Sequence, residues 1–223
     1  DTILLGWLAA PITLLWIIGI TNAFNLIDGL DGLAAGVGLI ASLTLSIISL
    51  TTGRLDVALL TVALAGALGG FLYYNFSPAS IFMGDSGSMF VGYLLAVLYV
   101  RGAQQADGVP LLAPILALSL PIADTLLAVV RRGFRRSPTN GGANGRDLFF
   151  GRLLAIFRRD QEHIHHRLVA AGLKDSQAVL ILYGTAAASG LIAILAFHSK
   201  TASIVLLAAM AGAAIYLALR GLR

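Results

Sequence analysis

The sequence predicts an all-α membrane protein, a multi-spanning helical bundle with about seven transmembrane helices in this chain. Of its 223 residues, 58% are hydrophobic and only 12% are charged, against about 25% charged in an average soluble domain. The apolar residues also gather into stretches close to the roughly 20 residues that a helix needs to cross a bilayer. These two observations exclude a soluble enzyme and a disordered tail. The absence of cysteine excludes a disulfide scaffold and thiol catalysis.

The predicted spans follow one another with short polar connections. In chain order they are Ile3–Ile20, Leu33–Thr52, Val57–Tyr74, Ser88–Val100, Val109–Val130, Ala178–Phe197 and Ala202–Leu219. The first is not a cleavable signal, because no basic segment precedes it. The second and third carry the pairs Gly32/Gly36 and Gly66/Gly70, which are typical of helix packing. The aromatic residues Trp7, Trp16, Tyr73 and Tyr74 are typical of membrane interfaces. The fourth span is the shortest.

The basic residues assign a topology to these spans. All but three of the fifteen Lys and Arg lie in one alternating set of loops, and the exceptions are Arg54, Arg101 and Lys200. The positive-inside rule places the richer set in the cytoplasm. We therefore expect one membrane domain over residues 1–223, with residues 131–177 forming a cytoplasmic basic loop. The net charge of +4 belongs to this face, so no nucleic-acid partner is expected.

The first polar motif, Asn22–Gly32, lies between the first two predicted spans and contains Asn25, Asp28 and Asp31. On a helical turn, Asp28 and Asp31 share one face at about 5–6 Å. Carboxylates this close repel each other unless a cation lies between them or one is protonated. Hard oxygen ligands without sulfur favour Mg²⁺ over zinc. The structural alternative is a pair of Asp residues at a helix start, with Asp31 as the N-cap.

The second polar motif, Phe82–Ser88, lies at the start of the fourth span and contains Asp85 between two glycines. Backbone amides at a helix start bind anions, and Asp85 can hold a metal ion beside such an anion. A helix N-cap is again the structural alternative. The charge-based topology places this motif on the same face as the first one.

The third polar motif lies in the basic loop and contains His163, His165, His166 and Arg167. Such side chains bind phosphates, transfer protons or ligate zinc. Upstream, aromatic residues and leucines between Phe149 and Phe157 repeat at helical spacing, which predicts an amphipathic helix in the headgroup layer. A solvated basic loop attracted to anionic lipid is the structural alternative.

Taken together and in order, Asn22–Gly32, Phe82–Ser88 and His163–Leu168 resemble the motifs of the polyprenyl-phosphate N-acetylhexosamine-1-phosphate transferases. Leu120–Thr125 and Arg131-Arg132 also fit, so the resemblance covers nearly the whole chain. The His-x-His-His-Arg form is similar to the branch of undecaprenyl-phosphate GlcNAc-1-phosphate transferases.

The resemblance implies an integral protein of the bacterial cytoplasmic membrane with its active face in the cytoplasm. It implies transfer of a sugar-1-phosphate, in particular N-acetylhexosamine-1-phosphate, from a UDP-sugar to polyprenyl (undecaprenyl) phosphate. UMP is released, and the product serves cell-envelope polysaccharide synthesis. The implied cofactor is Mg²⁺, with Mn²⁺ as an alternative, and a homodimer is left open.

The resemblance also implies a role for each motif residue. Asp85 holds magnesium on the diphosphate, with Asn25 and Asp28 as further ligands, and Asp31 helps to bind the nucleotide or sugar. His165, His166 and Arg167 bind the phosphates of the substrates. The expected catalytic residues are therefore Asp28, Asp31, Asp85 and His165, and the expected substrate-binding residues are Asn25, His163, His166 and Arg167.

The chain departs from the family pattern in one respect. Family members carry further upstream spans and an Asp-Asp motif in a cytoplasmic loop, and nothing here matches that motif. We expect this chain to be the C-terminal portion of an enzyme of about eleven spans, incomplete and inactive alone. A multi-spanning transporter and a degenerate non-catalytic homologue are the alternatives. A CDP-alcohol phosphotransferase is disfavoured because no Ala-Arg pair follows Asp28-Gly29.

Overall fold

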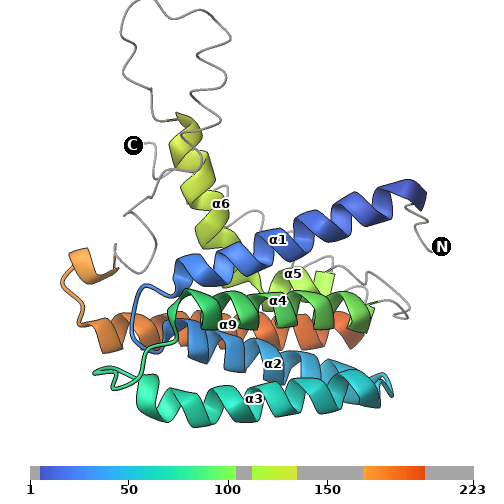
Figure 1. Cartoon of the computed structure of the whole chain (residues 1–223), viewed down its shortest axis with the longest axis horizontal. Helices are drawn as coiled ribbons and strands as arrows, with labels where there is room; N and C mark the ends of the chain where they lie inside the picture. The colour runs from blue at the N-terminus through green and yellow to red at the C-terminus, as the bar shows by residue number, and fades with distance from the viewer. Residues whose placement is uncertain (1–5, 104–111, 135–167, 199–223) are drawn as a thin grey trace, which may run out of the picture.

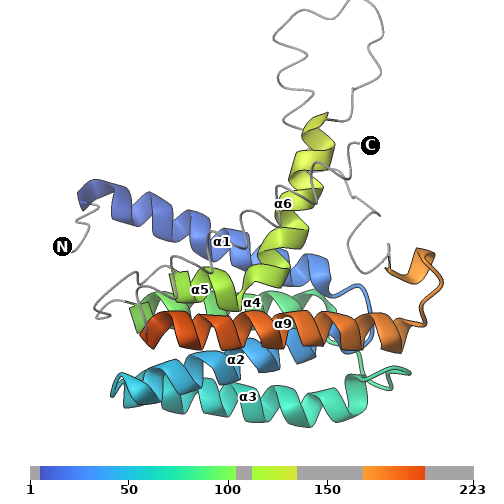
Figure 2. The same cartoon turned by 180° about the vertical axis from the view of Figure 1, so that it is seen from behind.

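A computed structural model describes residues 6–103, 112–134 and 168–198, and no strand occurs in these ranges. The helices are η1 (Gly6–Leu8), α1 (Ala9–Ile27), α2 (Leu33–Thr51), α3 (Leu55–Asn75), α4 (Gly84–Ala103), α5 (Leu112–Ala117), α6 (Ser119–Phe134) and α9 (Asp175–His198). Helices α2, α3, α4 and α9 lie side by side with similar axes, α1 crosses them obliquely, and α6 rises away from the bundle (Figures 1 and 2). The predicted all-helical bundle is confirmed.

Four described helices are long and apolar enough to cross a membrane. They are Gly6–Ile27, Leu33–Thr51, Leu55–Asn75 and Asp175–Phe197, and they correspond to the first, second, third and sixth predicted spans. The fourth predicted span lies within α4, whose first turn carries Asp85 and whose last turn carries Arg101. The seventh lies outside the described residues, so the number of seven spans stays a prediction.

The fifth predicted span, Val109–Val130, is wrong as one continuous helix. Leu118 separates α5 from α6, and the two helices differ in direction (Figure 1). Pro121 explains why the helix is interrupted, because proline has no N–H to bond the carbonyl one turn earlier and is tolerated in a first helical turn. The chain therefore starts a new helix at Ser119.

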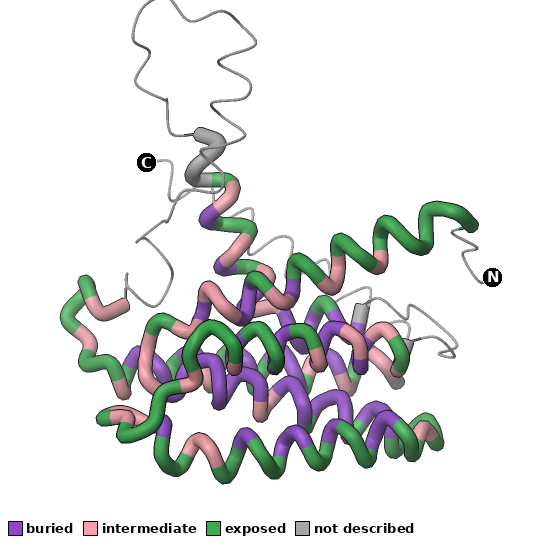
Figure 3. The backbone as a smooth tube through the Cα atoms, viewed as in Figure 1, coloured by how far each residue is buried: buried purple, intermediate pink, exposed green. Residues whose placement is uncertain are grey.

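Helix α2 is the centre of the packing. Most of its residues are buried, and it packs against α3, α4 and α9 (Figure 3). Its buried hydroxyl groups are satisfied locally or across helices. Ser42 donates to the carbonyl of Gly38 at 2.7 Å, and the Ser46 hydroxyl lies 2.8 Å from that of Thr61 in α3. These bonds allow polar side chains inside an apolar bundle.

Two aromatic residues tie α4 to its neighbours. Tyr99 donates to the carbonyl of Ala41 in α2 at 2.9 Å, and Trp16 donates to the carbonyl of Ala96 at 3.1 Å. The interpretation of Trp16 as an interface anchor is therefore incomplete, because its indole is half-buried against α4. Trp7 is 83% exposed, as an anchor would be.

The two glycine pairs differ in their surroundings. A Cβ at Gly36 would overlap the ring of Tyr183, so this position does permit a close approach of α9. At Gly66 and Gly70, a Cβ would meet nothing within 4 Å in the described part of the chain. A Cβ at Gly32 would also lie 3.2 Å from the Tyr183 hydroxyl, so the predicted packing role holds for Gly32 and Gly36.

The alternating helix directions give the bundle two chemically different ends. The end of α1, the start of α2, the end of α3 and the start of α4 meet at one side, which we call the acidic end (residues 25–32 and 75–88). The end of α2, the start of α3 and the end of α4 meet at the other, which we call the arginine end (residues 52–56 and 101).

Candidate active site at the acidic end

The first polar motif does not continue as a helix. Helix α1 ends at Ile27 with Asp28 as its C-cap, and the chain turns before α2 starts at Leu33. Gly32 has φ +80°, a left-handed conformation that favours glycine. The expectation that Asp28 and Asp31 share a helical face is therefore wrong, and Asp31 is not the N-cap of α2, because Gly32 occupies that position.

The second polar motif starts a helix, as expected. Helix α4 begins at Gly84, which has φ +66°, and Asp85 lies in its first turn. The positive end of the helix dipole favours a negative charge at this position. Ser88, which is fully buried one turn later, donates back toward the carbonyls of Gly84 and Asp85 at 3.1 and 3.2 Å.

Asn25 joins the two motifs across 60 residues of sequence. Its side-chain amide donates to Oδ1 of Asp85 at 3.1 Å and to Oγ of Ser88 at 3.2 Å. These bonds fix the position of the Asp85 carboxylate relative to α1. Asn25 was expected to be a metal ligand or to bind substrate, and in this arrangement its amide nitrogen orients Asp85.

Asp28 lies close enough to Asp85 for their charges to interact. Burial, and secondly repulsion from the Asp85 carboxylate, raise the pKa of Asp28 to about 6. The structure therefore brings together Asn25, Asp28 and Asp85, the three residues expected to surround a cation. A cation between the two carboxylates would relieve the repulsion.

The donor set fits magnesium better than a closed structural metal site. The described residues contain no group of three or more His, Asp or Glu side chains that could hold a metal ion. Magnesium commonly uses one or two carboxylates and completes its shell with water and substrate phosphates. Two carboxylate groups at an open end of the bundle are consistent with that mode of binding.

Asp31 has a different partner from Asp28. Its Oδ2 accepts a hydrogen bond from the backbone N–H of Ala79 at 3.0 Å, in the connection between α3 and α4. Asp31 thus links the turn after α1 to the connection that leads into the second motif. This contact holds the two loops of the acidic end together.

Sequence reasoning missed two residues that support the turn. Asn75, buried at the end of α3, accepts from the N–H of Gly32 at 3.1 Å and donates to the carbonyl of Ile81 at 2.9 Å. Tyr183 of α9 donates to the carbonyl of Gly32. Asn75 could have been singled out from the sequence, because it is a polar residue at the end of an apolar span. No local pattern indicates a role for Tyr183.

The third motif cannot be placed beside these residues. His163, His165, His166 and Arg167 lie outside the described residues, as does the predicted amphipathic helix upstream of them. Asp124 is buried in α6.

The fold and the acidic end define an integral membrane protein that holds paired carboxylates at one end of a helical bundle. Residues 1–103 match the family described as Glycosyl transferase family 4. The resemblance predicted from the three motifs is confirmed.

Several curated relatives are named as transferases, phosphotransferases among them. The chain is 42% identical over 180 residues (80% of its length) to a "Probable undecaprenyl-phosphate N-acetylglucosaminyl 1-phosphate transferase" of Bacillus subtilis, of which it covers 46%. It is 38% identical over 192 residues (77%) to a "Decaprenyl-phosphate N-acetylglucosaminephosphotransferase" of Mycobacterium tuberculosis, covering 43%. It is 34% identical over 190 residues (82%) to a "Phospho-N-acetylmuramoyl-pentapeptide-transferase" of Moorella thermoacetica, covering 50%. The chain thus spans about half the length of the curated relatives that it matches.

Proposed function

We propose that the protein containing this chain transfers N-acetylhexosamine-1-phosphate from a UDP-sugar to polyprenyl phosphate and releases UMP. The observation that carries the proposal is that Asn25 orients Asp85 at one end of an apolar bundle, within electrostatic range of Asp28. The names of the relatives supply the substrate class. Asp28 and Asp85 lie at an end of the bundle, which suits chemistry at a membrane surface better than transport through the middle.

The reaction requires charge neutralisation and positioning. An oxygen of the lipid phosphate attacks the phosphorus that carries the sugar, the bond from that phosphorus to the UMP oxygen breaks, and UMP leaves. Three anionic phosphates must approach one another, so catalysis of this kind depends on electrostatics and alignment. Magnesium bound at the site would neutralise the charge on the diphosphate.

Each residue of the acidic end has a defined part in this proposal. Asp28 and Asp85 provide the carboxylate oxygens for Mg²⁺, and Asn25 holds the Asp85 carboxylate in position. Asp31 keeps the α1–α2 turn against the α3–α4 connection, which shapes the place where the sugar nucleotide would bind. Mn²⁺ is the expected substitute, since it accepts the same oxygen ligands.

The remaining parts of the proposal concern the third motif and the location. His163, His166 and Arg167 would hold substrate phosphates, with His165 as a catalytic residue. The excess of Lys and Arg in the same set of loops supports a cytoplasmic acidic end in a bacterial membrane. Such a location allows a soluble nucleotide sugar to meet a membrane-bound acceptor.

The test is UMP release by the full-length protein with polyprenyl phosphate and UDP-N-acetylglucosamine. D85N should lower kcat by at least about 100-fold, because a preorganised charge that contacts the reacting phosphates is removed. D175N is the matched control, since Asp175 is an exposed carboxylate in the first turn of α9. Equal turnover by D85N and the parent protein would refute the assigned metal role, and absence of UMP release by the parent protein would refute the reaction.

A further inference from the structure

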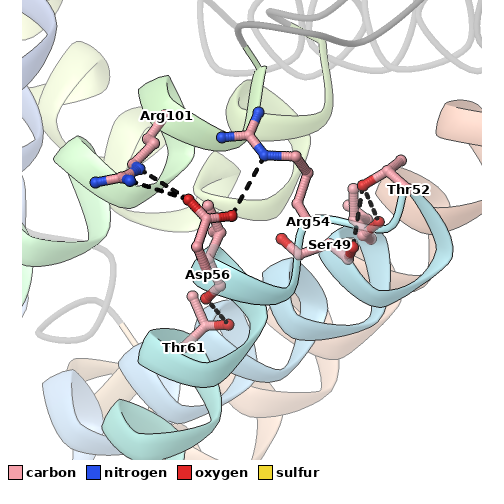
Figure 4. Close-up of polar contacts among 8 residues, drawn as sticks. Ser49, Thr52, Arg54, Asp56, Thr61 and Arg101 are labelled. Atoms are coloured by element: carbon pink, nitrogen blue, oxygen red, sulfur yellow. Dashed lines mark hydrogen bonds and ion pairs between the residues drawn. The ribbon is translucent and has the colours of Figure 1, made fainter.

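The arginine end contains a second charged cluster, which takes no part in the proposed reaction. Asp56, in the first turn of α3, accepts from Nε of Arg101 at 3.1 Å and lies 3.0 Å from its Nη2. Arg54 approaches the other oxygen of the same carboxylate through Nε at 3.4 Å (Figure 4). Two guanidinium groups therefore share one carboxylate, and the three side chains carry a net charge of about +1.

Arg54 is not fully satisfied by this arrangement. Its side chain is 17% exposed, and its Nη1 is buried without a hydrogen-bond partner among the residues that the structure describes. A buried guanidinium nitrogen with no acceptor is costly, since charged donors that lose water need a replacement. The second observation at this place is a pocket of about 420 Å³ that both arginines line.

The rest of the pocket wall is mostly apolar. Besides Arg54 and Arg101, the lining residues are Thr13, Ile17, Val97 and Val100, from α1 and α4. The pocket therefore combines two guanidinium groups, which can donate to phosphate oxygens, with aliphatic side chains. This combination fits an amphiphile that has an anionic head and a hydrocarbon chain.

The position in the bundle suits the same kind of ligand. Asp85 and Arg101 lie in the first and last turns of α4, so roughly 24 Å of helix separates the pocket from the acidic end at 1.5 Å per residue. That separation is close to the thickness of the hydrocarbon core. The pocket therefore lies where the headgroups of the opposite leaflet are expected.

We propose that this pocket binds the phosphate of an anionic membrane lipid, with the lipid chain against Ile17, Val97 and Val100. Guanidinium groups bind phosphate oxygens through two donors at once, and the Nη1 of Arg54 supplies a donor that no group in the described ranges accepts. Asp56 orients both arginines and also competes with the phosphate for them. The site is independent of the proposed transferase reaction.

The experiment measures lipid binding to the purified full-length protein by native mass spectrometry. Phosphatidylglycerol and phosphatidylcholine with identical acyl chains are titrated separately, and inorganic phosphate is added as a competitor. The variants are R54Q, R101Q and D56N, with K174Q as the control because Lys174 is exposed and lies before α9. Helix content and elution volume report whether each variant is folded.

The expected results have opposite signs for the two kinds of charge. R54Q and R101Q should each weaken phosphatidylglycerol binding about tenfold, whereas D56N should strengthen it because a competing carboxylate is removed. K174Q should bind like the parent protein. If D56N weakens binding together with the arginine variants, the cluster is only a structural clamp. Millimolar inorganic phosphate should weaken phosphatidylglycerol binding, because it competes for the same arginines. If phosphatidylcholine binds equally well, the proposed lipid site is wrong.

Discussion

The hydroxyl of Tyr183 donates a hydrogen bond to the backbone carbonyl of Gly32, across 151 residues of sequence. The N–H of the same glycine donates to the side-chain oxygen of Asn75 at 3.1 Å. The N–H and the carbonyl of Gly32, the left-handed N-cap of α2, are therefore both held by side chains from two other helices. The turn that carries Asp28 and Asp31 owes its position to α3 and α9 as well as to its own sequence.

Replacing Tyr183 by Phe should remove one bond to this turn without changing the ring that packs on Gly36. An interhelical hydrogen bond in a membrane protein is worth about 1 kcal/mol. We expect Y183F to lower the free energy of unfolding by about that amount, measured by thermal unfolding in detergent. Y73F is the matched control because Tyr73 is 82% exposed, and an equal loss in both variants would contradict the role of this bond.

Replacing Asn75 should cost more, because its side chain satisfies two backbone groups. N75A leaves the Gly32 N–H and the Ile81 carbonyl without this partner, and each buried group left unpaired costs about 1–3 kcal/mol. We expect N75A to destabilise the protein by about 2–4 kcal/mol, since both buried backbone groups lose this partner. N75D should destabilise it at least as much, because the acceptor-only carboxylate faces the Ile81 carbonyl and carries a buried charge. Denaturant titration of both variants checks this order, and near-parent stability of N75D would show that the bond to Ile81 is not important.

Two glycine-to-alanine changes should act in opposite directions. In G36A the new Cβ would lie 2.0 Å from the ring of Tyr183, so α9 must move or the ring must turn, at a cost of about 1–3 kcal/mol. In G66A the Cβ meets nothing within 4 Å in the described part of the chain, and Ala is favoured over Gly in a helix by about 0.5–1 kcal/mol. Melting temperatures of the two variants test the pair, and a similar loss in both would mean that α3 packs against another segment at Gly66.

The carboxyl group of Asp28 should make stability depend on pH in metal-free buffer. Its pKa is raised from 3.8 to about 6 in the folded state, mainly by burial, so the folded protein binds the proton more tightly than the unfolded chain. This contribution to stability is fully present below about pH 4 and is lost as the pH rises through about 6. Thermal unfolding between pH 4 and pH 8 in EDTA should show the loss, and D28N should remove it. An unchanged pH profile in D28N would assign the dependence to another group.

The residues of the acidic end show which features were predictable. The Asp-Gly motifs are local patterns at the ends of apolar stretches, so hydropathy and loop charge are enough to place them at a membrane surface. The direct contact between Asn25 and Asp85 could not be inferred, because it depends on how closely α1 approaches α4. The close approach depends on Gly92 in α4, which has no side chain. A Cβ at this position would lie 2.8 Å from Phe24 of α1, so only glycine fits there.

The sequence by itself determined that this protein is a helical membrane protein and roughly where several of its helices lie. It also singled out the polar motifs that we propose carry its chemistry. These properties follow from hydropathy, glycine and proline, which act over a few residues. Only the tertiary structure decided that Asp28 and Asp31 face different partners, that α5 and α6 diverge, and that Arg54 and Arg101 share Asp56. Such pairings depend on helix crossing and side-chain packing between segments far apart in the chain, and no local pattern encodes them.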